Sequence, residues 1–126
     1  MRAMQRILIG LSWMAAACSA FSQSLPADSA GFDLMTNKLT GNCMACHDLP
    51  GVSGKVSNFG PSLRGVGSKW TREELRQWVV DARKINADTL MPPFGSTAGL
   101  TKVRQSVNLL THEQINAVVD TLLSWQ

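Results

Sequence analysis

The feature that most constrains this chain is the segment Cys43-Met44-Ala45-Cys46-His47. Two thiols separated by two residues, with a histidine directly after the second, form a C-x-x-C-H pattern. This spacing lets both thiols reach the two vinyl groups of one porphyrin, and the histidine then falls under the iron. The motif therefore predicts one covalently attached haem c, bound at Cys43 and Cys46, with His47 as the proximal iron ligand.

Three other interpretations of the two cysteines remain open. A thioredoxin-like redox pair needs a βαβ context, and the sequence has no alternating apolar pattern long enough for a sheet. A structural zinc site needs four ligands, for which Cys43, Cys46, His47 and His112 are the candidates, although His47 is too close to Cys46 for the usual paired spacing. A disulfide between the two cysteines would suit a small secreted domain.

The start of the chain has the anatomy of a secretory signal peptide. A positively charged beginning precedes an apolar run of 11 residues, Ile7 to Ala17, and Ala20-Phe21-Ser22 is a suitable cleavage site. A membrane span needs about 20 apolar residues, and no segment of the chain reaches that length. We therefore expect residues 1–22 to be a signal peptide and residues 23–126 to be a single periplasmic cytochrome domain without a transmembrane segment.

An alternative exists for the leader. Ala15-Ala16-Ala17-Cys18 loosely resembles a lipoprotein signal, in which Cys18 becomes the lipidated first residue. The usual leucine three positions before the cysteine is missing, so the sequence favours the soluble form over a lipid anchor.

The charge balance argues against one class of partner. The chain has 12 Lys and Arg and 9 Asp and Glu, and removal of Arg2 and Arg6 with the leader leaves a net charge of +1. No run of basic residues marks a nucleic-acid-binding face. We therefore expect no nucleic acid among the partners.

Hydrophobic periodicity predicts an all-α fold. A first helix is expected over about residues 30–39, ended by Gly41. Two more helices should begin at capping boxes, Thr71 to Glu74 and Thr111 to Gln114, in which each Thr and the side chain three residues later cap one another. Each box is followed by an apolar stripe of helical spacing. The stripes consist of Leu75, Trp78, Val79 and Ala82 in the second helix, and of Ile115, Val118, Val119 and Leu122, widened by Leu123 and Trp125, in the third.

Long loops connect these helices. Residues 48–69 contain five Gly and two Pro, which is a loop composition. The segment Met91-Pro92-Pro93 cannot lie inside a helix, because proline removes a donor and clashes with the preceding turn. Long loops without secondary structure need an explanation in a compact domain, and a haem that serves as part of the core provides one.

Four side chains could be the sixth iron ligand: Met35, Met44, Met91 and His112. Met44 lies inside the attachment loop and cannot cross to the other haem face. Met35 lies on the apolar side of a helix, where methionine usually fills the core, and His112 begins the last helix, where a solvated side chain is expected. Met91 lies in a stiff proline-flanked loop, so we predict Met91 as the ligand, with an ordinary buried methionine as the alternative.

His/Met ligation has a functional consequence, because it raises the reduction potential and leaves no open iron position. It favours electron transfer over oxygen or peroxide chemistry. A backbone carbonyl commonly orients the ring of a ligating histidine, and the Pro61 carbonyl is our candidate, with a simple turn as the alternative. Arg64, Lys69 and Trp70 are candidates for the propionates, with a solvated basic loop as the alternative.

Two segments resemble a known family. The order Gly41-Asn42-Cys43-Met44-Ala45-Cys46-His47, followed by Gly60-Pro61-Ser62-Leu63-Arg64-Gly65-Val66-Gly67, is similar to class I cytochromes c. Val79-Val80-Asp81-Ala82-Arg83-Lys84-Ile85-Asn86, followed by Thr89-Leu90-Met91-Pro92-Pro93-Phe94, resembles SoxX, the monohaem c-type cytochrome subunit of the SoxAX sulfur-oxidation complex. The resemblance covers nearly all of the chain after the leader.

The resemblance implies a class I cytochrome c-like fold with helices and long loops wrapped around one covalent haem. It implies His47 and Met91 as axial ligands. It also implies an electron-transfer role within a two-subunit L-cysteine S-thiosulfotransferase-type complex, which joins thiosulfate oxidatively to a cysteine of a sulfur-carrier protein. The catalytic haem is then expected in a SoxA-like partner subunit, and electrons leave to a downstream acceptor cytochrome. A free-standing electron shuttle is the alternative.

Two residues depart from the family pattern. Ala87 stands where the family often has proline, and Gly95 stands where an aromatic residue often follows the Phe. Both concern the loop around Met91 and the partner interface, and neither changes a haem ligand.

Overall fold

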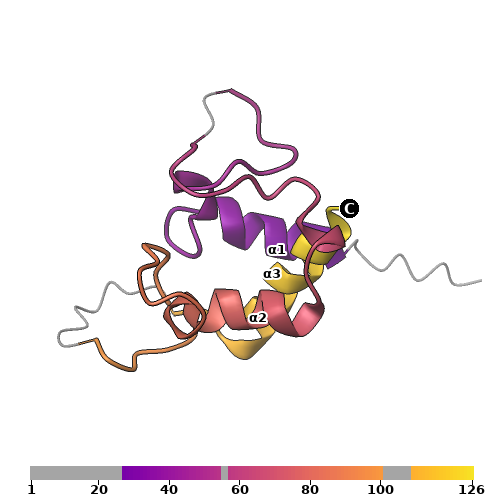
Figure 1. The fold of residues 1–126 in the computed structure, drawn as a ribbon. Coiled ribbons are helices and arrows are strands. Elements are labelled where there is room, and N and C mark those ends of the chain that lie inside the picture. Colours follow the sequence, from indigo (N-terminus) through magenta and orange to yellow (C-terminus); the bar gives the residue numbers. More distant parts are fainter. Residues whose placement is uncertain (1–26, 55–56, 101–108) are drawn as a thin grey trace, which may run out of the picture.

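The computed structural model describes residues 27–54, 57–100 and 109–126. The expected signal peptide and Cys18 lie outside the described residues. In these described ranges, three α-helices and three 3₁₀ turns make up the regular structure (Figure 1). In chain order they are α1 (Ala27–Thr36), η1 (Cys43–Ala45), η2 (Val66–Ser68), α2 (Arg72–Asp81), η3 (Ala82–Lys84) and α3 (His112–Ser124). Within the described residues there is no strand, as the sequence predicts, and no helix has the length and apolar character of a membrane span.

Helix α1 begins and ends about three residues earlier than the sequence predicts, at Ala27 and Thr36 instead of residues 30 and 39. Local hydrogen bonding at its C-terminus explains the earlier end. The Asn37 side chain accepts a hydrogen bond from the Leu39 backbone N–H at 2.8 Å, which offers the backbone an alternative to the helix. The Thr40 hydroxyl and the Gly41 N–H both donate to the Leu34 carbonyl, at 2.8 and 2.9 Å, and these bonds turn the chain toward the cysteine motif.

The two expected capping boxes are both present. Thr71 Oγ1 accepts from the Glu74 N–H at 3.3 Å, and the Glu74 carboxylate accepts from the Thr71 N–H at 2.8 Å. Thr111 and Gln114 make the same reciprocal pair, at 3.2 and 2.9 Å. Helices α2 and α3 therefore begin at the residues that the sequence predicts.

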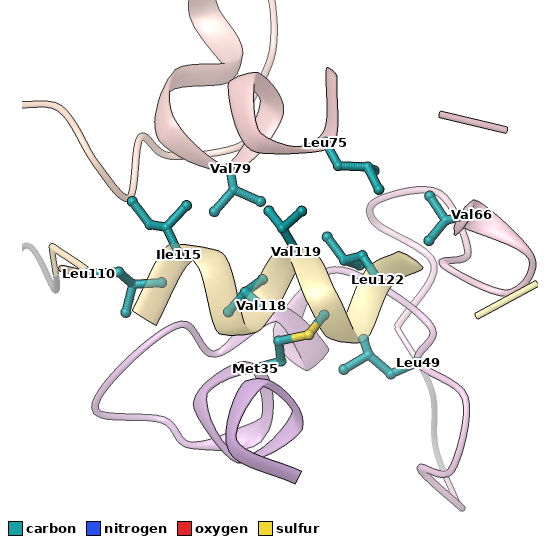
Figure 2. Packing of buried hydrophobic residues seen from close by; sticks show 10 residues of the cluster. All are labelled: Met35, Leu49, Val66, Leu75, Val79, Leu110, Ile115, Val118, Val119 and Leu122. Carbon is teal, nitrogen blue, oxygen red and sulfur yellow. The ribbon is translucent and has the colours of Figure 1, made fainter. Parts of the chain in front are cut away.

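The core lies between the three helices (Figure 2). Its centre is the apolar stripe of α3, which faces α1 on one side and α2 on the other. Met35 of α1 has 1% of its surface exposed and lies against this stripe. The core residues drawn are Met35, Leu49, Val66, Leu75, Val79, Leu110, Ile115, Val118, Val119 and Leu122. This arrangement confirms the stripes predicted for α2 and α3, with one exception.

The exception is Trp78, which is only half-buried and does not belong to the core cluster. Its ring lies 6.3 Å from that of Trp70, in an edge-on arrangement at 69°. The two indoles line a cavity next to the core. The helical spacing therefore places Trp78 beside the apolar stripe, on the face that α2 turns toward this cavity.

The long segments that the sequence predicts as loops lie outside the α-helices. The loop over residues 48–69 contains the short turn η2, whose Gly67 N–H donates to the Trp125 carbonyl at 2.8 Å. The segment after α1 and the segment after η3 lie on the same side of the helices (Figure 1). Cys43, Cys46 and His47 of the first segment and Met91 of the second line one cavity.

Candidate functional site

The cysteine motif is folded into a tight turn. Asn42 has a left-handed backbone (φ 47°) and leads into η1. The Cys46 and His47 N–H groups both donate to the Cys43 carbonyl, at 3.1 and 2.9 Å. This turn brings Cys43, Cys46 and His47 to the wall of one cavity.

That cavity has a volume of about 570 Å³. A second cavity of about 290 Å³ shares part of the same lining. The shared lining residues come from the motif, from the loop before η2 and from the loop after η3. They are Cys43, His47, Pro61, Met91 and Phe94. Volumes in this range, roughly 300–1,000 Å³, are those of cofactor sites. The fold thus brings two segments far apart in sequence, around His47 and around Met91, to one space.

The Pro61 carbonyl oxygen lies 2.7 Å from Nδ1 of His47. The bond forms when Nδ1 carries the proton, and Nε2 is then the nitrogen with a free lone pair. A carbonyl that binds one ring nitrogen fixes the tautomer and the orientation of a histidine whose other nitrogen binds a metal. The contact is the one that the sequence suggests for Pro61.

Gly60 allows this close approach. A Cβ atom at Gly60 would lie 2.6 Å from Cε1 and 2.8 Å from Nδ1 of His47. The ring therefore rests against the backbone of residue 60, and both residues line the larger cavity.

Replacing Gly60 with alanine should displace the His47 ring and weaken its bond to the Pro61 carbonyl. Overpacking of this kind typically costs about 1–3 kcal/mol, so we expect a lower unfolding midpoint and a changed absorption spectrum in the purified holo-protein. Ser53→Ala, an exposed change in the same loop, is the matched control. A Gly60→Ala protein with the midpoint and spectrum of the control would show that the ring does not depend on this contact.

A polar network fastens the Pro61 loop to the residue after His47. The Asp48 carboxylate accepts from the Ser62 hydroxyl at 3.0 Å and from Nε and Nη2 of Arg64 at 2.8 and 3.1 Å. The Leu63 N–H also donates to the Asp48 carbonyl at 2.9 Å. These bonds hold the pKa of Asp48 below its ordinary value, because Arg64 and Ser62 stabilise the charged form.

This network changes the role expected of one residue. Arg64 was a candidate for the propionates, but its guanidinium is engaged by Asp48 and it lines neither cavity. Lys69 and Trp70 do line the smaller cavity, beside Trp78. The sequence gives no direct signal for the Asp48–Arg64 pair, because the two residues are brought together by the loop between them.

The loop that carries Met91 is fixed at both ends. The Asn86 N–H donates to the Ala82 carbonyl at 2.9 Å where the loop leaves η3. The Phe94 N–H donates to the Val79 carbonyl at 3.2 Å where it returns beside α2. The Thr89 hydroxyl accepts from the Met91 N–H at 3.2 Å. Met91 therefore lies in a loop whose two ends are both attached near the C-terminus of α2.

The two departures from the family pattern fit this loop. The Asn86 side chain accepts from the Asp88 N–H at 3.0 Å, so a local turn shapes the chain around Ala87 without a proline. A Cβ at Gly95 would lie 2.9 Å from Cδ1 of Ile115. The backbone at Gly95 thus packs directly on α3.

The other candidates for a sixth ligand are placed differently. Met35 is buried in the core, although it also contributes to the wall of the smaller cavity. Met44 is partly buried and packs against the core. His112 is the exposed first residue of α3 and lines neither cavity. Of the four, Met91 alone lines both cavities together with His47.

The thiols do not suit the alternative chemistries. Burial raises the pKa of the Cys43 thiol to about 11, whereas redox-active cysteines have a lowered pKa. Both cysteines are free, so the structure contains no disulfide between them. His112, the fourth ligand that a zinc site would need, is exposed and lines neither cavity that Cys43 and His47 line.

The residues around the cavities fit a c-type haem. The larger cavity offers two thiols, an imidazole and a thioether on a largely apolar wall of suitable size. Cys43 and Cys46 would hold the porphyrin, and His47 and Met91 would flank the iron. When bound, the haem supplies one-electron redox chemistry.

Comparisons with known proteins agree with this geometry. The family model described as cytochrome c oxidase, cbb3-type, subunit III, matches residues 27–120. The chain belongs to this cytochrome c family. The match covers all three helices up to Asp120 and the motif segment, and it falls within the domain expected over residues 23–126.

A solved structure gives a more specific likeness. The crystal structure of SoxXA from P. pantotrophus matches with a TM-score of 0.71 and 29% sequence identity, over 78% of this chain and 80% of that chain. No curated protein sequence matches the chain. The fold is a cytochrome c fold, and the chain is a SoxX-like cytochrome, as the resemblance in the sequence implies.

Proposed function

We propose that this chain is the monohaem electron-transfer subunit of a periplasmic SoxAX-type complex that acts in thiosulfate oxidation. Cys43 and Cys46 attach the haem, and His47 and Met91 are the axial ligands. The observation that carries the proposal is that His47 and Met91 line the same cavities in a chain with a SoxXA-like fold. With both axial positions filled by the protein, the chain carries electrons and does not bind substrate at the iron.

The electrons come from the partner's chemistry in this proposal. Joining thiosulfate to a cysteine thiol of a carrier protein forms one S–S bond, and the reaction releases the thiol proton and two electrons. This chain has no cysteine outside the leader apart from Cys43 and Cys46, which the haem occupies. The sulfur chemistry therefore belongs to a SoxA-like subunit, and this chain passes the electrons singly to a downstream acceptor cytochrome.

An apolar rim around the larger cavity supports a stable partner. Phe59 and Leu90 line that cavity, yet 67% and 77% of their surfaces are exposed. Leu39 is 80% exposed and lies between Lys38 and Thr40, which also line the cavity. Clustered large apolar side chains on a surface mark interaction sites, and permanent interfaces are larger and more apolar than those of transient redox pairs.

Co-expression tests the proposal. The tagged chain is produced with a SoxA-type cytochrome of the same organism, purified from the periplasm and weighed intact by native mass spectrometry. We expect a one-to-one complex that turns over thiosulfate with a thiol acceptor. A lone chain with one haem would instead favour a free-standing electron shuttle.

Serine substitutions locate the interface. Replacing Leu39, Phe59 and Leu90 together should weaken association at least about 30-fold, which corresponds to about 2 kcal/mol, the loss expected from interface anchors. Ile85→Ser is the matched control, because Ile85 is an exposed apolar residue that lines neither cavity. Equal association of the two variants would place the partner on another face.

A further inference from the structure

An ion pair between a buried carboxylate and a half-buried guanidinium lies where α2 meets η3. The Asp81 side chain is 3% exposed, and its two oxygens accept from Nε and Nη2 of Arg83 at 2.7 and 2.8 Å. The Asp81 carboxylate also accepts from the Arg83 backbone N–H at 3.3 Å. These bonds hold the pKa of Asp81 below its ordinary value, because the guanidinium stabilises the charged form.

The same guanidinium reaches across to the far side of the Met91 loop. Nη2 of Arg83 donates to the Ala98 carbonyl at 2.8 Å. Arg83 precedes the loop and Ala98 follows it, so this bond ties the chain before Met91 to the chain after it. Neither Asp81 nor Arg83 lines either cavity, so the pair cannot act on the haem site by direct contact.

Two backbone bonds hold the chain that returns from Met91 beside this tie. The Phe94 and Gly95 N–H groups donate to the Val79 and Val80 carbonyls, at 3.2 and 3.0 Å. These two bonds bring the returning chain to the end of α2, and the Arg83 bond extends the attachment to Ala98. The segment between Arg83 and Ala98 is therefore a loop attached at both ends, which contains Met91 and is stiffened by Pro92 and Pro93.

A buried carboxylate is costly to maintain, since its loss of hydration is only partly repaid by its partner. An apolar pair would fill this place at lower cost. A forked guanidinium, however, can hold a carboxylate with two donors and still present an N–H to a carbonyl. In this way Arg83 joins Asp81, at the end of α2, to the Ala98 carbonyl after the Met91 loop.

We propose that Asp81 and Arg83 are positioning residues for Met91, which close the loop that presents its thioether to the haem iron. The inference rests on the proposed ligation of iron by Met91. Its consequence is that the closed, ligated state of the loop is favoured over an open one by the Arg83 bonds. A weakened tie raises the open population, and an external ligand then competes more effectively for the sixth position.

The test uses purified holo-protein and four variants: Arg83→Ala, Arg83→Lys, Lys84→Ala and Met91→Ala. Imidazole binding to the ferric protein, the reduction potential and the thermal unfolding midpoint are measured for each. Arg83→Ala should bind imidazole about tenfold more tightly than the wild type, the size of effect expected from one charge-assisted hydrogen bond. The imidazole affinity of Arg83→Lys should lie between those of the wild type and Arg83→Ala, because lysine keeps the charge but loses the forked pair of donors. Lys84→Ala removes a neighbouring exposed cation and should match the wild type.

The outcomes separate the inference from the function on which it rests. If Arg83→Ala lowers only the unfolding midpoint, while imidazole affinity and potential equal those of Lys84→Ala, the pair is merely structural and the inference is wrong. If Arg83→Ala does not yield folded protein, the same comparison is made with Arg83→Lys. If Met91→Ala itself binds imidazole no better than the wild type, the ligation of iron by Met91 is wrong, whatever Arg83 does.

Discussion

Replacing Met91 with alanine is expected to open the sixth iron position and to lower the reduction potential by on the order of 0.1 V, within the roughly 0.8 V over which axial ligands set haem potentials. The thioether favours the ferrous state. Met35, which also lines the smaller cavity, is held in the core with 1% of its surface exposed, and Met44 packs against the core. Cyanide or imidazole should then bind to the iron of the variant, whereas Met91 keeps this position closed in the wild type. Redox titration and ligand titration of the holo-protein measure both effects.

Met44→Ala is the matched control for this experiment, because it removes a methionine beside the attachment motif that packs against the core. It should keep the wild-type potential and remain closed to external ligands. A Met91→Ala protein indistinguishable from this control in both titrations would contradict the assignment of Met91 as a ligand.

Replacing Gly31 with alanine should destabilise the fold by about 3 kcal/mol, the upper part of the range for overpacking. Gly31 is buried where α1 crosses α3, and a Cβ there would overlap the Ala117 carbonyl oxygen and the Thr121 hydroxyl. Backbone atoms cannot move aside without shifting α3, which forms the centre of the core. Chemical unfolding of the holo-protein measures the loss.

The sign of this effect makes the test sharp. On helix propensity alone, glycine to alanine in the middle of a helix stabilises by about 1 kcal/mol. Ala30→Gly, at the exposed neighbouring position, should show that propensity effect by losing about the same amount. If Gly31→Ala were stabilising, the crossing of α1 and α3 would have to be wider than the structure shows.

Much of the fold follows from local sequence signals. The capping boxes at Thr71 and Thr111 are complete within four residues each, so they fix the starts of α2 and α3 without tertiary help. The end of α1 is different, because it depends on Asn37 and on bonds to the Leu34 carbonyl that form as the chain turns into the motif. These bonds compete with the backbone bonds that would continue the helix, and a hydrophobic pattern does not show which of the two forms.

Some features of the candidate site could likewise be predicted from the sequence, and others could not. The C-x-x-C-H pattern identifies its own chemistry, and the prolines beside Met91 mark a rigid loop. The partner of Arg64 was not foreseeable, because Asp48 lies on the other arm of a long loop and both arms must fold before the pair can form. Arg83 looks like an ordinary basic residue in the sequence, and only its bond to Ala98 shows the connection to the Met91 loop.

Local sequence patterns are enough to predict the all-helical class, the attachment motif and the starts of two helices, since each depends on residues a few positions apart. The packing of the chain brings His47 and Met91 to one space, the Pro61 carbonyl to His47, and the exposed Phe59 and Leu90 to the lining of the larger cavity. Those relations join segments distant in the chain. They exist because α1 and α2 pack on α3, which brings the segment after α1 and the segment after η3 to the same side of the helices.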